Sequence, residues 1–448
     1  MEISLIGFAA VLILAFLRVP IAFAMGIVGM IGFAAINRWS WKSALSPAAG
    51  TVLDTIQTES LSVIPLFVLM GMLVSRAGLA NELYRASNAF LGHRRGGLSM
   101  ATIVACGGFS AICGSSLATA ATMSKVAMPQ MRAFGYSDSL ATASIAAGGT
   151  LGILIPPSVI LIIYGIMTEQ SIDKLFLAGI IPGIIGIIFY LAAVRWTVFR
   201  NPEAGPAGAR ADWAERISAL KDVWGIVLLF VAILGGIYLG IYTVTEAAGI
   251  GAGGALLIAW MRGGLTWDGL RESLIATIGT TAMLFFVLIG AQIFQRFIVR
   301  AGMPDDLVAF VTAFDVPNIV VILLIILVYI ILGCVFESLS MLLLTVPVFA
   351  PVVVDLGLFP DFPGVKGDEM SLIWFGIIVV VVTEISLITP PVGLNVFVLR
   401  GVLGDVTTGT IFKGVTPFWI VDILRLLLFV LVPAIVLFLP LTIKPFAF

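Results

Sequence analysis

Two pairs of interruptions in long apolar runs constrain the fold of this chain most strongly. The first pair is Cys113–Thr119 with Gly148–Ser158, and the second is Glu337–Ser340 with Thr389–Gly393. Glycines, hydroxylated residues and Pro-Pro pairs at these places release backbone amide and carbonyl groups from helical hydrogen bonds. Inside a bilayer, such breaks are tolerated only where they are buried in protein or line a cavity. Two broken segments in corresponding halves are typical of the binding site of a secondary transporter.

The composition places these breaks in a membrane protein. Of the 448 residues, 60% are hydrophobic and 11% are charged, whereas a soluble domain carries about 25% charged residues. Many apolar runs approach or exceed the roughly 20 residues that cross a hydrocarbon core. The net charge of −1 gives no reason to expect a nucleic-acid partner, so membrane lipid is the expected surrounding.

The spacing of the apolar runs predicts an all-α polytopic membrane protein. The two arms within 98–134, and the two within 318–356, are short for a full crossing, so we expect two re-entrant helical hairpins. Two crossings of a thin membrane are the alternative for the first. The ranges 136–167 and 371–399 are predicted to be broken helices. Further helices are expected near 3–17, 20–36, 61–74, 224–242, 247–261 and 417–439, and another follows a turn at 168–174 and ends near Arg195. Interfacial helices are expected at 78–95 and 266–275, the second leading into a helix up to about Phe294, and a loop over 37–60.

These elements divide the chain into four consecutive segments. Residues 1–95 are expected to form scaffold helices and an interfacial arm, and 96–195 the first half of a transport domain, with hairpin one and a broken helix. Residues 196–300 are expected to form a cytoplasmic loop, scaffold helices and a second arm. Residues 301–448 complete the transport domain with hairpin two, a broken helix and the last helix.

An internal repeat relates the two halves. Thr122–Gly135 aligns with Leu344–Gly357 without gaps, and the same offset pairs Ser116-Leu117 with Ser338-Leu339. Most of the 24 basic residues fall on one side of the predicted spans, which is therefore cytoplasmic. Hairpin one then opens to the cytoplasm and hairpin two to the outside. The repeat is predicted to be inverted.

The residues in the breaks suit small cations and an anion. Hydroxyl groups of the first break and carbonyls of 148–156 offer the oxygen ligands and negative helix ends that Na⁺ prefers. The second set offers the same chemistry with Ser338, Ser340, Thr383, Ser386 and Thr389. Free N–H groups at the half-helices after Ser116 and Pro157 suit an anionic group of a substrate. The alternative is that small residues only let helices pack closely.

Four ionisable residues are expected inside the membrane. Glu337 and Glu384 lie beside the second breaks, and a functional role and a structural hydrogen-bonded role are both open for them. Asp422 and Arg425 are three residues apart on one predicted helix, which favours a structural ion pair. The single histidine, His93, lies in a basic cluster, so an intramembrane enzyme with a metal-binding or Ser/His site is not expected.

Three motifs resemble one transporter family. The run Gly114–Thr119, the Gly-Ile-Leu-Ile-Pro-Pro-Ser of 152–158 and the Thr-Pro-Pro-Val-Gly-Leu-Asn of 389–395 are similar to the large membrane (M) subunit of tripartite ATP-independent periplasmic (TRAP) transporters, in the ion transporter superfamily. The runs 17–23 and 65–71 are also similar, and the resemblance covers essentially the whole chain. Because the extra N-terminal helices of fused versions are not present, a separate small membrane subunit is expected.

The resemblance implies sodium-coupled uptake of an organic acid (carboxylate) across the bacterial inner membrane by an elevator mechanism, with a periplasmic substrate-binding protein, at least two coupling Na⁺ ions and no organic cofactor. It implies a first sodium site at Ser115, Ser116, Gly149, Gly152 and Pro156. It implies a second at Ser338, Thr383, Thr389, Pro391 and Gly393. Substrate is expected between the hairpin tips, at Gly114, Ser116, Thr119, Pro157, Ser158, Glu337, Ser340 and Asn395.

Other functions fit parts of the same pattern. A stand-alone sodium- or proton-coupled anion symporter of the same superfamily is the main alternative, and an ion channel or pore is the second. Glu337 stands where the first half has Ser115, so the two tips depart from strict equivalence.

Overall fold

The computed structural model describes residues 2–313, 316–334, 336–362 and 365–442, and its fold is built from helices. Besides the helices, these residues contain one isolated β-bridge, between Phe362 and Val365. The first half contains α1 (Glu2–Phe16), α2 (Ile21–Ile36), α3 (Trp41–Gln57), α4 (Val63–Arg76), α5 (Leu79–Leu91), α6 (Gly97–Cys113), α7 (Ser116–Ala133), α8 (Asp138–Thr150), α9 (Val159–Thr168) and α10 (Ile172–Arg200).

The second half begins with a short amphipathic helix. Its elements are α11 (Trp213–Asp222), α12 (Trp224–Phe230), a π-helical turn (Val231–Gly235), α13 (Gly236–Tyr238), α14 (Val244–Met261), α15 (Trp267–Arg300), α16 (Met303–Thr312), α17 (Asn318–Gly333), α18 (Ser338–Asp355), α19 (Gly367–Ser386), α20 (Leu394–Leu403), α21 (Thr408–Leu431) and α22 (Ala434–Leu437). Short 3-10 turns lie at Glu59–Ser62, Pro202–Ala204 and Pro440–Thr442.

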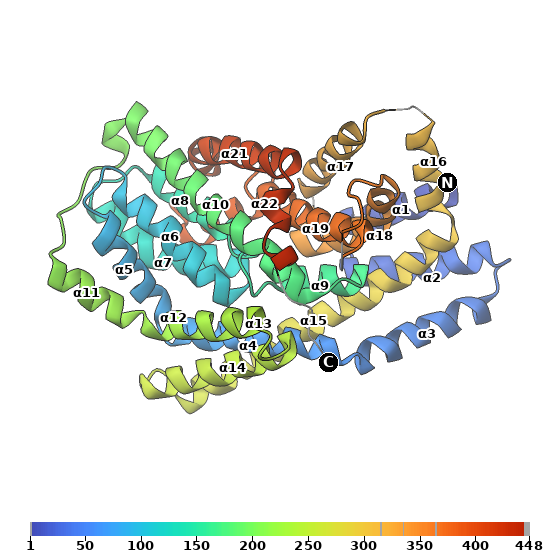
Figure 1. The fold of residues 1–448 in the computed structure, drawn as a ribbon, viewed down its shortest axis with the longest axis horizontal. Coiled ribbons are helices and arrows are strands. Elements are labelled where there is room, and N and C mark those ends of the chain that lie inside the picture. The colour runs from blue at the N-terminus through green and yellow to red at the C-terminus, as the bar shows by residue number, and fades with distance from the viewer. Residues whose placement is uncertain (1, 314–315, 335, 363–364, 443–448) are drawn as a thin grey trace.

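Both predicted hairpins are present. In hairpin 1 (α6 and α7), the backbone N–H of Leu98 donates to the hydroxyl of Tyr136 at 3.1 Å, so the two outer ends meet. In hairpin 2 (α17 and α18), Nδ2 of Asn318 donates to the carbonyl of Leu356 at 2.8 Å. Figure 1 shows hairpin 1 in the left half of the molecule and hairpin 2 in the right half. The predicted inverted repeat is confirmed.

Both broken helices are present as well. The first consists of α8 and α9 with an unwound segment over 151–158, and the second of α19 and α20 with one over 387–393. The Pro156–Pro157 and Pro390–Pro391 peptide bonds are both cis. Gly393 has a φ of +59° at the start of α20, a left-handed conformation that favours glycine. The predicted breaks therefore fall where the sequence placed them.

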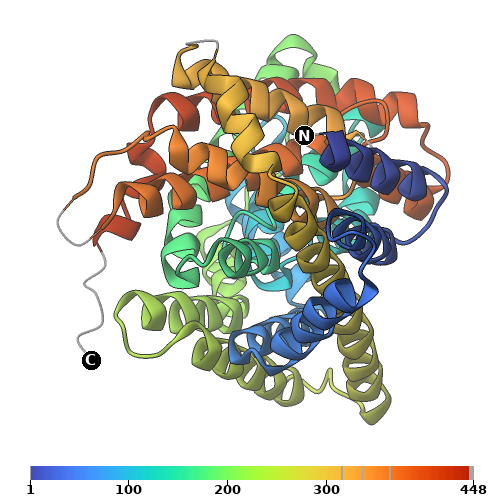
Figure 2. The same cartoon turned by 90° about the vertical axis from the view of Figure 1, so that its right-hand side faces the viewer.

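Burial separates a central part of the molecule from helices that face lipid. In α19, 89% of the residues in the most apolar 18-residue stretch are buried inside the protein, whereas in α15 only 33% of the corresponding stretch is buried. Seven helices of the described residues are long and apolar enough to cross a membrane, or eight if the bent pair of α11 with α12–α13 is one span. Figure 2 shows α1 to α3 and α15 together on one side of the hairpins, where the apolar residues left exposed suit contact with lipid.

Three expectations for individual elements were wrong, and one helix had not been predicted. The loop expected over 37–60 contains α3, where Ala44, Ala48, Thr51 and Thr55 form one buried face; the charged residues hid this helical spacing. The separate piece expected at 266–275 is the first part of the continuous helix α15. Helix α16 was not predicted. The last long helix begins at Thr408 and contains Pro417, because a proline bends a helix without always ending it.

Arg132, at the end of hairpin 1, joins three elements at the exposed surface. Its guanidinium contacts the carboxylate of Asp138 in α8 at 2.8 Å and that of Asp405, between α20 and α21, at 2.7 Å. The hydrogen bond from Arg132 lowers the pKa of Asp405. A lowered carboxyl pKa adds stability above the unfolded-state pKa of about 3.9, and that stability is lost as the pH falls through the lower, folded-state pKa.

We therefore expect Asp405→Asn to lower the melting temperature slightly at pH 7, with a difference from the parent protein that closes below about pH 4. The measurement is thermal unfolding in detergent across this pH range. Asp268→Asn removes a carboxylate from the start of α15 as a control. A difference that persists unchanged at low pH would contradict the role assigned to the Arg132–Asp405 pair.

Candidate functional site

The two hairpin tips are built from glycine and serine. Gly114 ends α6 with a φ of +62°, and the side chain of Ser115 then caps α7 by accepting a hydrogen bond from the N–H of Ala118 at 3.3 Å. In hairpin 2, Glu337 occupies the capping position of α18 without a side-chain capping bond. Its carboxylate instead accepts a hydrogen bond from Ser340 Oγ at 3.3 Å. The two tips thus differ in their capping residue and in charge.

Glu384 of α19 connects the two tips. Its carboxylate accepts a hydrogen bond from Ser116 Oγ of hairpin 1 at 2.5 Å and another from Ser338 Oγ of hairpin 2 at 3.1 Å. The side chain is buried, with 1% of the residue exposed. Hairpins that enter from opposite ends of the molecule therefore meet at a single carboxylate. The sequence singled out this residue but left its role open.

Part of the first predicted sodium site, Gly149 and Gly152 with Ser116, lies at the end of α8. A Cβ added to Gly149 would lie 3.1 Å from the carbonyl oxygen of Ser116, so a side chain here would crowd the tip of hairpin 1. A Cβ on Gly152 would lie 2.8 Å from Ser110 Oγ, a hydroxyl that donates to Thr119 Oγ1 at 3.2 Å. Ser115 lies one residue before Ser116 at the tip. Pro156 lies instead against α10, where its ring faces Gly179.

The second predicted sodium site is divided between two places. Ser338 and Thr383 lie beside Glu384, and Thr383 Oγ1 donates to the carbonyl of Val380 at 2.8 Å. Thr389 lies toward α21, where its Oγ1 accepts a hydrogen bond from Trp419 Nε1 at 3.0 Å. Pro391 is exposed, and Gly393 faces the ring of Phe412. The sequence pattern did not reveal this division, because Trp419 and Phe412 belong to a later helix.

Asn395 of α20 reaches across to the first broken helix. Its Nδ2 donates to the carbonyl of Ala146 at 3.0 Å and lies 3.3 Å from the position of a Cβ on Gly149. Among the described residues, its buried Oδ1 has no hydrogen-bond partner. Asn395 therefore brings a free carbonyl oxygen close to the end of α8.

A cavity of about 450 Å³ lies between the tips and two scaffold helices. Both tips line it, with Gly114–Ala118 of hairpin 1 and Glu337–Leu339 of hairpin 2, and α4 and α15 form the opposite wall. A Cβ on Gly71 of α4 would lie 3.0 Å from the carbonyl oxygen of Cys113, so the scaffold closely approaches hairpin 1. This volume suits a small-molecule ligand.

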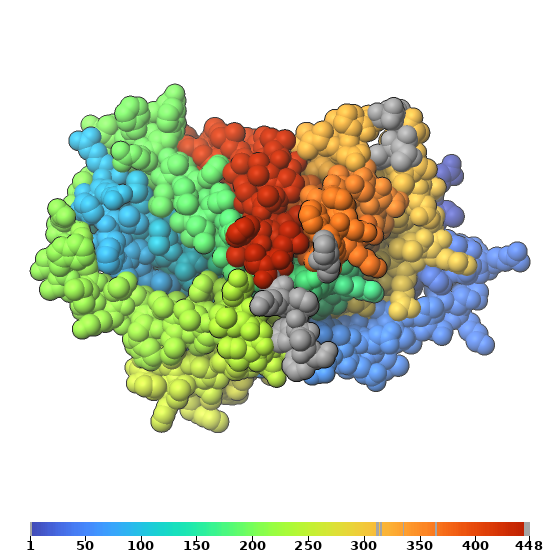
Figure 3. Space-filling model, in the orientation of Figure 1, coloured from blue at the N-terminus to red at the C-terminus, as the bar shows by residue number. Residues whose placement is uncertain are grey.

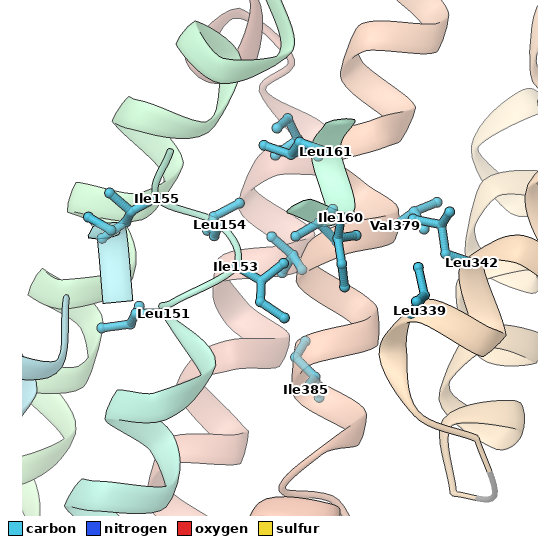
Figure 4. Packing of buried hydrophobic residues seen from close by; sticks show 14 of the residues in the cluster. Leu151, Ile153, Leu154, Ile155, Ile160, Leu161, Leu339, Leu342, Val379 and Ile385 are labelled. Atoms are coloured by element: carbon cyan, nitrogen blue, oxygen red, sulfur yellow. The ribbon is translucent and has the colours of Figure 1, made fainter. Parts of the chain in front are cut away.

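The cavity is apolar on the side of the first break. Ile153, Ile160 and Leu339 line it. Figure 4 shows Ile153 and Ile160 between the unwound segment after α8 and the second-half residues Val379, Leu342 and Leu339. These apolar side-chain contacts hold the unwound segment in place, and backbone hydrogen bonds from Leu151, Gly152 and Ile155 to Gly148, Gly149 and Leu151 support it.

Helix ends supply most of the electrostatic character of this region. The N-termini of α7 and α18, with their free N–H groups, open at the cavity, and they favour an anion. The C-termini of α8 and α19 end at the two breaks, and their carbonyls favour cations. Among the described residues that line the cavity, no side chain is cationic, and Glu337 is the one acid.

The predicted substrate residues are only partly brought to the cavity. Gly114, Ser116 and Glu337 line it. Ser158 caps α9 instead, by accepting a hydrogen bond from the N–H of Leu161 at 3.3 Å. The buried Thr119 and Ser340 bond to neighbours, and the Pro157 carbonyl faces Gly114. The sequence missed the scaffold wall, whose members are Val68, Gly71, Met72 and Ser75 of α4 and Thr280, Met283 and Leu284 of α15.

The ligands available for a cation are hydroxyl, carbonyl and carboxylate oxygens. Within the described residues, no group of three or more His, Cys, Asp and Glu side chains is placed to hold a metal ion. Oxygen ligands of this kind suit a hard monovalent ion such as Na⁺. Oxygen ligands of the type that Na⁺ prefers are therefore present, but in the second predicted set Thr389, Pro391 and Gly393 lie apart from Ser338 and Thr383.

An inverted pair of hairpins that meet two broken helices at a buried cavity defines a multi-pass membrane transporter. Of known structures, the YdaH transporter of Alcanivorax borkumensis shares this fold with a TM-score of 0.61 and 17% identity, covering 87% of this chain and 89% of that chain.

Sequence comparison then identifies the family. A model described as "Tripartite ATP-independent periplasmic transporter, DctM component" matches residues 8–435, and the chain belongs to this family. It is 34% identical to the C4-dicarboxylate TRAP transporter large permease protein of Pseudomonas aeruginosa, over 87% of this chain and 88% of that protein. It is 32% identical to the sialic acid TRAP transporter large permease protein of Vibrio cholerae, over 95% and 96%.

These findings confirm the predicted family and multi-pass membrane location, and the bacterial inner membrane is consistent with the family. The relatives are transporter permeases rather than enzymes. Membership of the family implies a small membrane subunit and a periplasmic binding protein as partners.

Proposed function

We propose that the protein imports an organic anion, in the first place a carboxylate, together with Na⁺ by an elevator mechanism. It works with a small membrane subunit and receives the substrate from a periplasmic binding protein. The observation that carries this proposal is the meeting of both hairpin tips at Glu384 beside the cavity. Two relatives are permeases of a C4-dicarboxylate and of a sialic acid TRAP transporter, which supports a carboxylate as the substrate class.

Charge balance links the cations to the anion. A carboxylate that enters the cavity meets the N-termini of α7 and α18, but it also approaches the carboxylates of Glu337 and Glu384. Burying an uncompensated negative charge is unfavourable. Since none of the described lining residues supplies a cationic side chain, bound Na⁺ ions at the broken helices would supply the missing positive charge. Anion binding would then require cation binding, which is the basis of symport.

The arrangement of the helices supports the elevator mechanism. The two hairpins and two broken helices pack on one another, and the cavity separates their tips from α4 and α15. A unit that carries the whole site could slide along this wall and open the cavity to either side, as in inverted-repeat transporters.

Uptake into proteoliposomes tests the proposal. The chain is reconstituted with its small membrane subunit, the binding protein is added outside, and uptake of a radiolabelled C4-dicarboxylate and of sialic acid is measured. We expect accumulation that requires both an inward sodium gradient and the binding protein. Sodium-driven uptake without the binding protein would favour the stand-alone symporter, and flux without any gradient would favour a pore.

Ser116→Ala tests the first sodium site. The substitution removes a hydroxyl ligand, and a hydrogen-bonding group of this kind contributes about 1 kcal/mol. We therefore expect the sodium concentration for half-maximal uptake to rise about fivefold, with folding largely retained. Ser124→Ala is a matched control, because this serine of the same helix bonds to the carbonyl of Ala121 at 2.7 Å. Unchanged sodium dependence of Ser116→Ala would remove Ser116 from the site.

A further inference from the structure

Helix α11 carries an exposed apolar stripe. Trp213, Ile217 and Leu220 recur at helical spacing and are 69%, 52% and 57% exposed. Among the described residues of α11, Arg216 and Ala219 are the buried ones, so the helix is attached by a different face. An exposed stripe of this kind on a short polar helix is typical of a helix that lies in a membrane interface.

Arg216 fixes α11 on the interfacial helix α5. Its Nε donates to the carbonyl of Ala89 at 3.2 Å. Its guanidinium lies over the ring of Phe90 at 5.7 Å and over that of Trp213 at 5.1 Å. The orientation of α11 is therefore set by the protein, and the apolar stripe is directed outward. Figures 1 and 3 show α11 at the left edge of the molecule, beside α5.

Exposed tryptophans place α11 at the cytoplasmic face of the membrane. Trp196 near the end of α10, Trp260 near the end of α14 and Trp267 at the start of α15 are all strongly exposed. These helix ends lie on the side that is rich in basic residues, which is the cytoplasmic side. Tryptophan gathers at the level of lipid headgroups. Trp213 lies at the same end of the molecule, so the stripe is close to the cytoplasmic leaflet.

A basic pocket lies beside the stripe. It has a volume of about 430 Å³ between α5, α11 and the backbone of 208–211. Arg85 and Arg210 line it, together with Asn88, Ser218 and one acid, Glu215. Arg210 is exposed, and Arg85 lies 3.9 Å from the carboxylate of Asp222. Partial burial and the nearby guanidinium groups of Arg216, Arg94 and Arg210 lower the pKa of His93. The region is electropositive.

We propose that α11 and α5 form a binding surface for an anionic phospholipid of the cytoplasmic leaflet. The apolar stripe of α11 contacts the acyl chains, and Arg85 and Arg210 hold the phosphate headgroup in the pocket. The charge of the pocket and the apolar stripe next to it are complementary to the two parts of this lipid and not to a neutral one. This role is independent of the solute that the protein transports.

Lipid titration of the full chain tests the headgroup site. The purified chain in a neutral detergent is titrated with phosphatidylglycerol or phosphatidylcholine, and its thermal unfolding midpoint is measured. We expect phosphatidylglycerol to raise the midpoint more than phosphatidylcholine does. The half-saturating concentration of phosphatidylglycerol should increase roughly thirtyfold in the double variant R85Q/R210Q, at about 1 kcal/mol per arginine, and high salt should weaken the effect.

The double variant R195Q/R271Q is the matched control, because it removes the same charge from exposed positions outside the pocket. The control should retain the response to phosphatidylglycerol. Equal responses to the two lipids, or an equal loss of response in the two double variants, would overturn the proposal.

A spin label tests the stripe. With Cys106, Cys113 and Cys334 replaced by serine, Ile217→Cys and Ala214→Cys are each labelled in nanodiscs that contain phosphatidylglycerol. We expect the label at position 217 to collide mainly with lipid-soluble oxygen, and the label at position 214 with a water-soluble nickel complex. Equal exposure of both labels to the nickel complex would show that the stripe is not in lipid. Shielding of position 217 from both reagents would indicate a protein partner instead, and would likewise overturn the proposal.

Discussion

Glu384→Ala is expected to reduce sodium-driven uptake at least about tenfold and to lower the free energy of unfolding by roughly 3 kcal/mol. A buried hydrogen bond contributes about 0.5–1.5 kcal/mol, the cavity left by a large-to-small substitution adds to the loss, and the Glu384 side chain accepts one bond from each hairpin tip. Alanine leaves two buried hydroxyls without their shared acceptor and an empty space between the tips. Proteoliposome uptake as a function of sodium concentration and thermal unfolding in detergent measure the two effects.

Two further variants separate the role of this carboxylate from general effects of charge. Glu384→Gln keeps the shape and one acceptor oxygen, so its uptake should lie between those of the parent and the alanine variant. Asp368→Asn removes an exposed acid from the first turn of the same helix and should behave like the parent. If Glu384→Ala transports with unchanged sodium dependence, the contact between the tips has no part in transport.

Arg425→Ala is expected to destabilise the fold by about 3–5 kcal/mol, because it leaves a buried acid without its partner. Asp422 and Arg425 of α21 are almost wholly buried and form an ion pair at 2.7 Å. Asp422 also accepts a hydrogen bond from Tyr190 at 2.7 Å, and that hydroxyl lies 2.7 Å from Thr150 Oγ1 at the end of α8. The ion pair therefore stabilises the end of α8, where the first break begins, through Tyr190 and Thr150.

The double variant D422L/R425M distinguishes the destabilisation caused by an unpaired buried charge from the net contribution of the ion pair to the free energy of unfolding. Apolar replacement of a buried ion pair is often close to neutral, so the double variant should unfold at a temperature much nearer to the parent than Arg425→Ala does. Combining it with Tyr190→Phe removes the hydroxyl that would otherwise lose its acceptor. A double variant that is less stable than Arg425→Ala would show that the charges themselves stabilise the fold. Thermal unfolding in detergent measures all of these effects.

The hairpins and breaks could be predicted because their signals are local. A glycine-serine or Pro-Pro interruption in an apolar run changes the backbone where it occurs, whatever surrounds it. The prediction of α3 failed for the opposite reason. Its face Ala44–Thr55 packs against α2 and also against α15, which is remote in sequence, and Thr55 bonds to Gln292 of α15. Without those neighbours, its small and charged residues resemble a loop.

The sequence alone determined that this is a membrane protein with two inverted, interrupted halves, because hydropathy and backbone breaks depend on residue type and order. Only the tertiary structure decided that Ser116 and Ser338 share one acceptor, since Ser116 and Glu384 are 268 residues apart. It also decided that α4 and α15 close the cavity and that Thr389 bonds to Trp419. Which side chains meet depends on how whole helices pack, and no local pattern contains that information.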